Sequence, residues 1–310
     1  MKNTIRQTQF LLTPAEQALL PSEEDIRFYE TNGYYVSQKI VPDDLLDSVL
    51  EASERYYSGQ VEEGPPVPSE CLPTGEPYSG LRQHCFVSLR CSEIRKLAHF
   101  PLVAATAARL ARVDEIRLWR DFLLFKPTGM APKTRVGWHR DRAYWLDCTS
   151  SKMMTAWIPL TSISQEMGAL QVIPGSNHWR FEGENARRFG EQNLEEQEAQ
   201  LAAQGLSTNP VPVVLEKGQV SFHSCLVLHA SSENTSTQPR RSFAIHLQDG
   251  DNRFCEAFLK SGENLRWNSE LVRRDDRGLP DFTDPIYCPI LWRESDAGVV
   301  DASNSAQPPF

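Results

Sequence analysis

The hydrophobic positions of the first third of the chain recur at helical spacing. From Ser22 to about Arg55 they follow two N-terminal helix signals, Ser22 with Asp25 and the sequence Pro42-Asp43-Asp44. A second helical stretch covers roughly residues 91–112, with Pro101 suited to a first helical turn. Five prolines in residues 59–80 predict a long loop between the two stretches.

From Arg117 onward, short apolar segments alternate with turn signals, a pattern typical of short strands. These segments are 117–126, 153–160, 169–173, 211–215, 219–229 and 241–248. The order predicts a mainly β fold with flanking α-helices, an antiparallel sandwich or barrel with the helices packed outside. Residues 182–204 form a charged, helical insertion, which is either a solvated surface helix or a lid. We expect the tail, residues 296–310, to be frayed.

Composition narrows the class of protein. The 310 residues allow one large domain or two small ones, and the net charge of −9 argues against nucleic acid as a partner. The chain has no membrane-spanning apolar run and no visible secretory signal, so we expect no membrane association and a cytoplasmic location. Seven scattered cysteines without a C-x-x-C pair argue against a disulfide framework and against a thiolate zinc site.

Among the seven histidines, His139 has the most suggestive neighbour. In an extended segment His139 and Asp141 point to the same face, so both can reach one ion. With a distant second histidine they would form the 2-His-1-carboxylate triad that binds Fe(II) and leaves coordination positions open. His223 and His229 both qualify, because they are six residues apart and could face inward from one straight strand. We expect His246 to be a core or edge histidine.

A basic residue downstream of this segment has an evident use. A guanidinium forms a bidentate pair with a carboxylate, and a metal-bound 2-oxo acid needs its far carboxylate held in that way. Arg240 and Arg241 are neighbours at the start of an expected strand, so at most one of them points inward.

In combination, four segments resemble the phytanoyl-CoA dioxygenase family. They are W-H-x-D at 138–141, A-W-I-P-L at 156–160, G-A-L-Q-V-I-P-G-S-x-H at 168–178, and F-H-x5-H-x-S-x2-N-x4-P-R at 222–240. The resemblance runs from about residue 20 to 250. It implies one Fe(II)- and 2-oxoglutarate-dependent oxygenase domain over residues 1–310. That domain would have a helical part at about 20–115 and a double-stranded β-helix (jelly-roll, cupin-like) core at about 117–295.

The resemblance also assigns residues by position. The implied iron ligands are His139, Asp141 and His229. The implied co-substrate contacts are Arg240 on the distal carboxylate, the Ser231 hydroxyl, the aromatic wall Trp157 and the polar residue Lys126. The spacing of Ser231 and Arg240 favours His229 over His223, which would then line the substrate cavity.

The substrate contacts rest on weaker signals. Alternation along the strand at 117–126 places Arg120 on the same face as Lys126, so Arg120 points inward if Lys126 does. Trp145 matches a position that often touches substrate in relatives, and Arg142 and Tyr144 lie close by. Aromatic rings with arginines suggest a flat or apolar small molecule that carries a carboxylate or phosphate. The alternative is that these arginines pair with surface acids.

The resemblance implies hydroxylation of an unactivated C–H bond of a small molecule, such as a secondary metabolite. Oxygen would be consumed, and succinate and CO2 released. Asp141 disfavours chlorination, because halogenating relatives have a small residue there. Desaturation, epimerisation and ring formation use the same iron site and stay open as alternatives. A non-redox cupin-like isomerase or hydrolase also stays open as an alternative. The oligomeric state stays open as well. Residues 59–80 and 182–204 are candidate lids.

Overall fold

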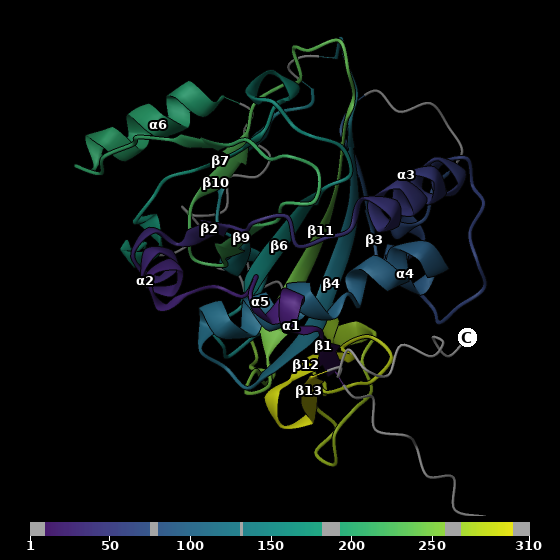
Figure 1. Cartoon of the computed structure of the whole chain (residues 1–310). Helices are drawn as coiled ribbons and strands as arrows, with labels where there is room; N and C mark the ends of the chain where they lie inside the picture. The colour runs from purple at the N-terminus through teal and green to yellow at the C-terminus, as the bar shows by residue number, and fades with distance from the viewer. Residues whose placement is uncertain (1–9, 75–79, 131–132, 182–192, 258–267, 300–310) are drawn as a thin grey trace, which may run out of the picture.

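The computed structural model describes residues 10–74, 80–130, 133–181, 193–257 and 268–299 (Figure 1). The α-helices are α1 (Pro14–Gln17), α2 (Glu23–Asn32), α3 (Asp43–Tyr57), α4 (Ser92–Ala98), α5 (Pro101–Ala111) and α6 (Leu194–Ala203). The strands are β1 (Phe10–Leu12), β2 (Tyr34–Val36), β3 (Arg82–Cys85), β4 (Glu115–Lys126), β5 (Val136–His139), β6 (Met154–Pro159), β7 (Leu170–Val172), β8 (Val211–Val213), β9 (Ser221–Ser224), β10 (His229–Ser231), β11 (Arg240–Asp249), β12 (Ile290–Arg293) and β13 (Ala297–Val299). Within the described residues, no helix is both long and apolar enough to span a membrane.

Two antiparallel sheets form the core. The larger sheet has the order β12-β4-β11-β6-β9-β2, with β3 also paired to β4, and the smaller sheet has the order β5-β10-β7-β8. Residues of both sheets, including Trp157 and Ala244 from the larger and Leu170 and Val172 from the smaller, share one buried cluster. The sheets therefore face each other, and the predicted mainly β, jelly-roll fold is confirmed.

Helices cover the outer face of the larger sheet. Met154, Ala156 and Ile158 of β6 share a buried cluster with apolar residues of α2, α3, α4 and α5. Thr155 and Trp157 alternate with them and turn to the space between the sheets, as the pleat requires. Helix α6 lies apart from this layer, beside the smaller sheet (Figure 1). The predicted helical starts are confirmed at Ser22, which caps α2, and at Pro42, which precedes α3.

The register of β11 decides which side chains meet on the inner face. Arg240 pairs with Lys126 of β4, and six residues later His246 pairs with Arg120 of β4 and Thr155 of β6. The register then shifts, so that Leu247 pairs with Leu118 of β4. The bulge leaves Trp119 without a partner in β11.

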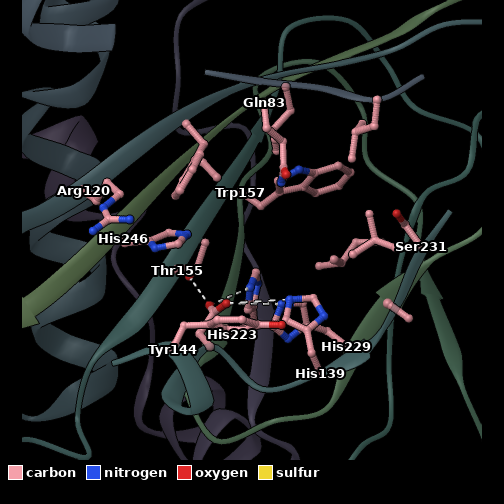
Figure 2. Close-up of a pocket in the computed structure, with 18 of the residues that line it drawn as sticks. Gln83, Arg120, His139, Tyr144, Thr155, Trp157, His223, His229, Ser231 and His246 are labelled. Carbon is pink, nitrogen blue, oxygen red and sulfur yellow. Dashed lines mark hydrogen bonds and ion pairs between the residues drawn. The ribbon is translucent and has the colours of Figure 1, made fainter. Parts of the chain in front are cut away.

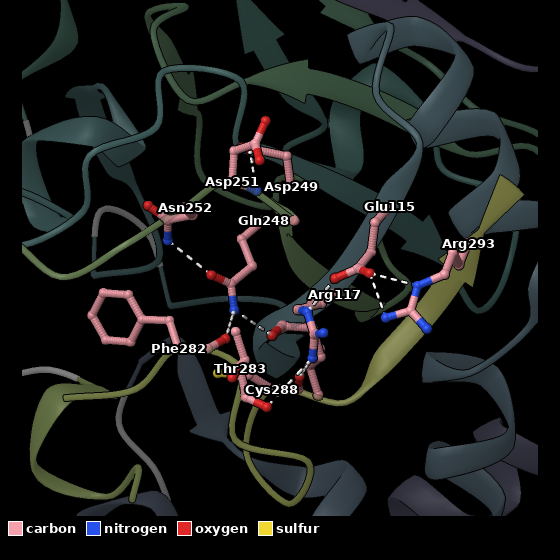
Figure 3. Close-up of polar contacts among 12 residues, drawn as sticks. Glu115, Arg117, Gln248, Asp249, Asp251, Asn252, Phe282, Thr283, Cys288 and Arg293 are labelled. Atoms are coloured by element: carbon pink, nitrogen blue, oxygen red, sulfur yellow. Dashed lines mark hydrogen bonds and ion pairs between the residues drawn. The ribbon is translucent and has the colours of Figure 1, made fainter. Parts of the chain in front are cut away.

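Residues beyond the bulge are held by a buried amide. The Gln248 side chain donates to the carbonyls of Leu118 (3.2 Å) and Phe282 (3.0 Å) and accepts from the Asn252 amide at 2.8 Å (Figure 3). These bonds connect the segment around Phe282 to the first half of β4 and to the last residues of β11.

The prediction of one strand over residues 219–229 is wrong. The structure has β9 in the larger sheet and β10 in the smaller one. A tight turn separates them, in which the Ser224 carbonyl accepts from the Val227 N–H at 3.1 Å. The Ser224 hydroxyl accepts from the Leu226 N–H at 3.2 Å. The chain uses this turn to cross between the sheets.

Three further expectations need correction or limits. Residues 297–299 of the expected frayed tail, 296–310, pair in parallel with β1, whose backbone groups offer them partners. Residues 300–310 lie outside the described part of the chain.

Of the expected insertion 182–204, residues 182–192 also lie outside the described part of the chain. Helix α6 is not solvated on all sides, since Gln197 accepts from the Trp138 N–H at 2.9 Å and Leu194 packs in the same cluster as Trp138. Within the loop 59–80, residues 75–79 are likewise undescribed.

A disulfide joins Cys71 to Cys85, contrary to the argument from scattered cysteines. The two residues are 14 apart in sequence, and the turn at Ser69–Cys71 lies against β3, which carries Cys85. Spacing in the sequence does not reveal this contact. The remaining cysteines, Cys91, Cys148, Cys225, Cys255 and Cys288, are free.

The disulfide predicts a thiol count. In denaturant without reductant five thiols should react with a colorimetric thiol reagent, and Cys71→Ser should raise that count by one because Cys85 is released. Reduction should lower the free energy of unfolding by about 3 kcal/mol, the value for a loop of about 15 residues. A wild-type count of seven without reductant would contradict the pairing.

Candidate functional site

Three predicted metal ligands converge between the sheets. His139 ends β5 and pairs in register with His229 of β10, and Asp141 follows at the start of a 3-10 turn. The Asp141 Oδ1 atom lies 3.5 Å from the His229 Nε2 atom and 3.9 Å from the His139 Nε2 atom. All three side chains are buried, and one ligand atom from each lies within 4.8 Å of the others. This spacing suits a single ion.

The environment prepares both imidazoles to bind a metal. The Nδ1 atom of His139 lies 2.8 Å from the Gly137 carbonyl, and that of His229 lies 3.2 Å from the Val227 carbonyl. A proton on each Nδ1 leaves the Nε2 lone pairs directed at the common point. Burial lowers the pKa of His139 to about 3 and that of His229 to about 4, so both are neutral at neutral pH. Neutral imidazoles and a carboxylate are the donor set that ferrous iron takes in a facial triad.

The second carboxylate oxygen of Asp141 is held from the larger sheet. The Thr155 hydroxyl donates to Asp141 Oδ2 at 2.6 Å, and the His223 Nε2 atom lies 3.7 Å from the same oxygen (Figure 2). His223 therefore lies beside the triad, as a neighbour of Asp141, and lines the cavity.

A cavity of about 230 Å³ opens over the triad. Ser231 lies at one end, Arg120 and His246 lie at the other, and Trp157 lies between them (Figure 2). These positions define a Ser231 half and an Arg120 half of one cavity, which also contains the triad.

The Ser231 half contains Arg240, which is buried with 3% exposure. Its guanidinium lies 5.4 Å from the centre of the Trp157 ring and donates to the Gly168 carbonyl. Gly168 has a φ of +68°, and a Cβ there would lie 2.4 Å from the Ser232 carbonyl oxygen, so only glycine fits. The Nε atom of Arg240 has no hydrogen-bond partner among the described residues.

Lys126 lies one layer behind the cavity wall. Its Nζ atom donates to the Ser231 hydroxyl at 2.8 Å and to the Ser232 carbonyl. Burial, together with the neighbouring Arg240, holds the pKa of Lys126 well below its usual range. Lys126 therefore orients Ser231.

The other half is aromatic with one arginine. The Arg120 guanidinium lies over the rings of Phe86 and Phe122 and donates from Nε to the Asn268 amide oxygen at 2.8 Å. The His246 ring lies 4.8 Å from the Trp145 ring, and its Nδ1 atom has no hydrogen-bond partner among the described residues. Tyr144 and Trp145 also line the cavity.

Arg142 does not reach the cavity. Its guanidinium donates to the carbonyls of Trp145 and Cys148, the latter at 2.6 Å. The sequence interpretation included Arg142 because it lies close to Trp145 in the chain, whereas in the 3-10 turn at residues 141–144 its side chain returns to the backbone.

Sequence reasoning missed Thr155 and misplaced His246. Both positions carried a usable signal, since His246 is an even number of residues from Arg240, and Thr155 is an even number from Trp157. Gln83 of β3 also lines the cavity, and nothing in the sequence pattern indicated it.

Comparison with known proteins gives a consistent result. The sequence profile described as phytanoyl-CoA dioxygenase matches residues 29–242. The peroxisomal phytanoyl-CoA dioxygenase of Homo sapiens is 24% identical over 259 residues, covering 78% of this chain and 72% of that protein. The enzyme of Bos taurus is 24% identical, covering 89% of this chain and 82% of its own.

Solved structures share the fold. The non-heme α-ketoglutarate-dependent carbocyclase SnoK from nogalamycin biosynthesis superposes with a TM-score of 0.59 at 22% identity, covering 76% of this chain and 86% of its own. The epimerase SnoN, in complex with Fe3+, α-ketoglutarate and nogalamycin RO, gives a TM-score of 0.60 at 20% identity, covering 89% and 98%. EctD from S. alaskensis, with 2-oxoglutarate and 5-hydroxyectoine, gives 0.61 at 19% identity, covering 84% and 86%.

The profile match spans most of the chain and includes every segment that builds the triad. The protein is a non-heme iron dioxygenase that depends on 2-oxoglutarate, and it belongs to the phytanoyl-CoA dioxygenase family.

Proposed function

We propose that this protein hydroxylates an unactivated C–H bond of a small molecule. In this proposal His139, Asp141 and His229 hold Fe(II), and Arg240 with Ser231 holds the distal carboxylate of 2-oxoglutarate. One observation carries the assignment: a buried arginine, without a carboxylate partner among the described residues, lies in the same cavity as three buried ligands.

The charge of Arg240 argues for an anionic ligand. Burial lowers the pKa of Arg240 to about 9, so the guanidinium is still charged at neutral pH. A buried charge is costly unless it is paired, and a carboxylate matches the guanidinium fork in two hydrogen bonds. A bound carboxylate would also favour the charged form of Lys126, which stands behind Ser231.

Different side chains have different roles in the proposed reaction. Oxygen is the oxidant; when bound, iron would activate it, and 2-oxoglutarate would supply two electrons as it is converted to succinate and CO2. Arg240 and Ser231 orient the co-substrate, and the Trp157 ring separates it from the Arg120 half. The buried aromatic wall limits water at the site and positions the C–H bond that reacts. Desaturation, epimerisation and ring formation would use the same positioning.

Anaerobic titration tests the metal and co-substrate assignment. Fe(II) and 2-oxoglutarate added to the wild type should produce the weak visible charge-transfer band of a chelated 2-oxo acid. His229→Ala should show no band, because one ligand is missing. Arg240→Ala should need about 10- to 100-fold more 2-oxoglutarate, since a charged hydrogen-bonded pair is lost.

Arg241→Ala is the matched control for this titration. Arg241 is the next residue of β11, faces the opposite side and pairs with Glu54 at 2.5 Å. Its removal should leave the co-substrate requirement unchanged. Absence of the band in the wild type, together with tight zinc binding, would instead support a non-redox metalloenzyme on the same fold.

The Arg120 half is the proposed substrate site. Arg120 is held by Asn268 and by two rings, so its guanidinium is already oriented in the wall. His246 presents a ring nitrogen without a partner among the described residues. Trp145, Tyr144 and His223 complete the lining. This chemistry fits a flat or apolar molecule that carries a carboxylate or phosphate.

Binding of simple probes tests the substrate class. With Mn(II) and 2-oxoglutarate present, phenyl phosphate and phenylacetate should bind at least about 10-fold more tightly than uncharged 2-phenylethanol. Arg120→Gln should remove that difference, and His246→Phe serves as a second variant that leaves Arg120 in place. Equal calorimetric affinity of the charged and uncharged probes for the wild type would contradict an anion anchor.

Several broader expectations stay as proposals. A single domain is supported by one buried cluster that contains residues from Phe10 to Trp292. The cytoplasmic location, the lid role of residues 59–80 and 182–204, and a secondary-metabolite substrate rest on the sequence.

A further inference from the structure

A transverse row of polar side chains crosses the inner face of the larger sheet below the triad. Successive strands pair Arg120 with His246, His246 with Thr155, and Thr155 with His223. All four line the cavity. Two of them, Thr155 and His223, approach the same oxygen of Asp141.

The two oxygens of Asp141 have different neighbours. Oδ1 faces the His229 and His139 Nε2 atoms, at 3.5 and 3.9 Å. Oδ2 accepts from the Thr155 hydroxyl at 2.6 Å and lies 3.7 Å from His223 Nε2. The ligand histidines and the larger sheet therefore contact opposite oxygens of one carboxylate.

We propose, on the basis of the metal site proposed above, that Thr155 and His223 are positioning residues that make Asp141 a one-oxygen ligand. A carboxylate that binds through both oxygens takes two coordination positions, and one that binds through a single oxygen takes one. With two histidines and one carboxylate oxygen, three positions of a six-coordinate ion stay open. Thr155 and His223 thus keep open the coordination positions that the co-substrate and oxygen need.

The residue types support a functional reason for this contact. Thr155 is buried at 2% exposure in β6, an inner strand of the larger sheet, where valine has the same shape and suits the strand equally well. A hydroxyl in such a place is costly unless it is hydrogen-bonded, and here its acceptor is Asp141. His223 is buried at 2% exposure, and its Nδ1 atom has no hydrogen-bond partner among the described residues. A proton on Nε2 would place a second donor beside Oδ2.

Thr155→Val tests the proposal through metal binding, without any need for turnover. The dissociation constant of Mn(II), measured anaerobically by calorimetry and by the EPR signal of free Mn(II), should rise about 10- to 100-fold. Thr155→Ser keeps the hydroxyl and should stay within about threefold of the wild type. Combining Thr155→Val with His223→Leu should cost less than the product of the single effects, because both residues act on one oxygen.

Thr106→Val is the matched control. Thr106 is equally buried in α5, and its hydroxyl donates to the Leu102 carbonyl, away from the cavity. It reports the general cost of losing a buried hydroxyl and should leave Mn(II) affinity unchanged. A thermal unfolding curve for each variant identifies those that fail to fold.

The outcomes separate this inference from the proposed function. If Mn(II) binds the wild type and His229→Ala abolishes binding, the metal site stands. If Thr155→Val then binds within about threefold of the wild type, or Thr106→Val loses as much affinity, the positioning role is wrong. If His229→Ala binds as the wild type does, the metal site itself is wrong.

Discussion

The backbone pairing of β11 with β4 and β6 is the constraint on which the site depends. One register sets Arg240 beside Lys126 at one end and His246 beside Arg120 and Thr155 at the other. Because side chains alternate between faces, one face of three adjacent strands supplies the cavity lining from the larger sheet, including Arg120, Thr155 and His246. The outer positions of the same strands pack under the helices, so the core and the site are made by one hydrogen-bonded ladder.

The site concentrates groups that are costly to bury. Neutral histidines, a guanidinium and a carboxylate share a cavity between two apolar clusters. Each is partly satisfied by its neighbours: backbone carbonyls bind the Nδ1 atoms of both ligand histidines, and Thr155 binds Asp141. The Arg240 Nε atom has no hydrogen-bond partner among the described residues, and Arg240 lines the cavity, where a ligand can bind its guanidinium.

Much of the site could be predicted because its signals lie within single strands. Alternation placed Arg120 on the inner face, and spacing favoured His229 over His223, in agreement with the three side chains that converge. The contact of Thr155 with Asp141 could not be predicted, because it depends on how β6 of the larger sheet lies against the turn that follows β5 of the smaller sheet. Local geometry was the other limit: a 3-10 turn redirected Arg142, and a turn between sheets divided the expected strand at 219–229.

The bulge after His246 determines where the inner face stops. Past it, Leu118 packs in the cluster under the helices, so Arg120 is the last residue of β4 that reaches the cavity. The proposed co-substrate and substrate sites therefore share one span of sheet, from Arg240 to His246, roughly 20 Å at the usual rise per residue. Substitutions within a row can change what the cavity accepts without altering its length. Inserting one residue into β4 or β11 would turn the side chains that follow it to the opposite face of the sheet. This chain can therefore change its substrate specificity far more easily by substitution than by insertion.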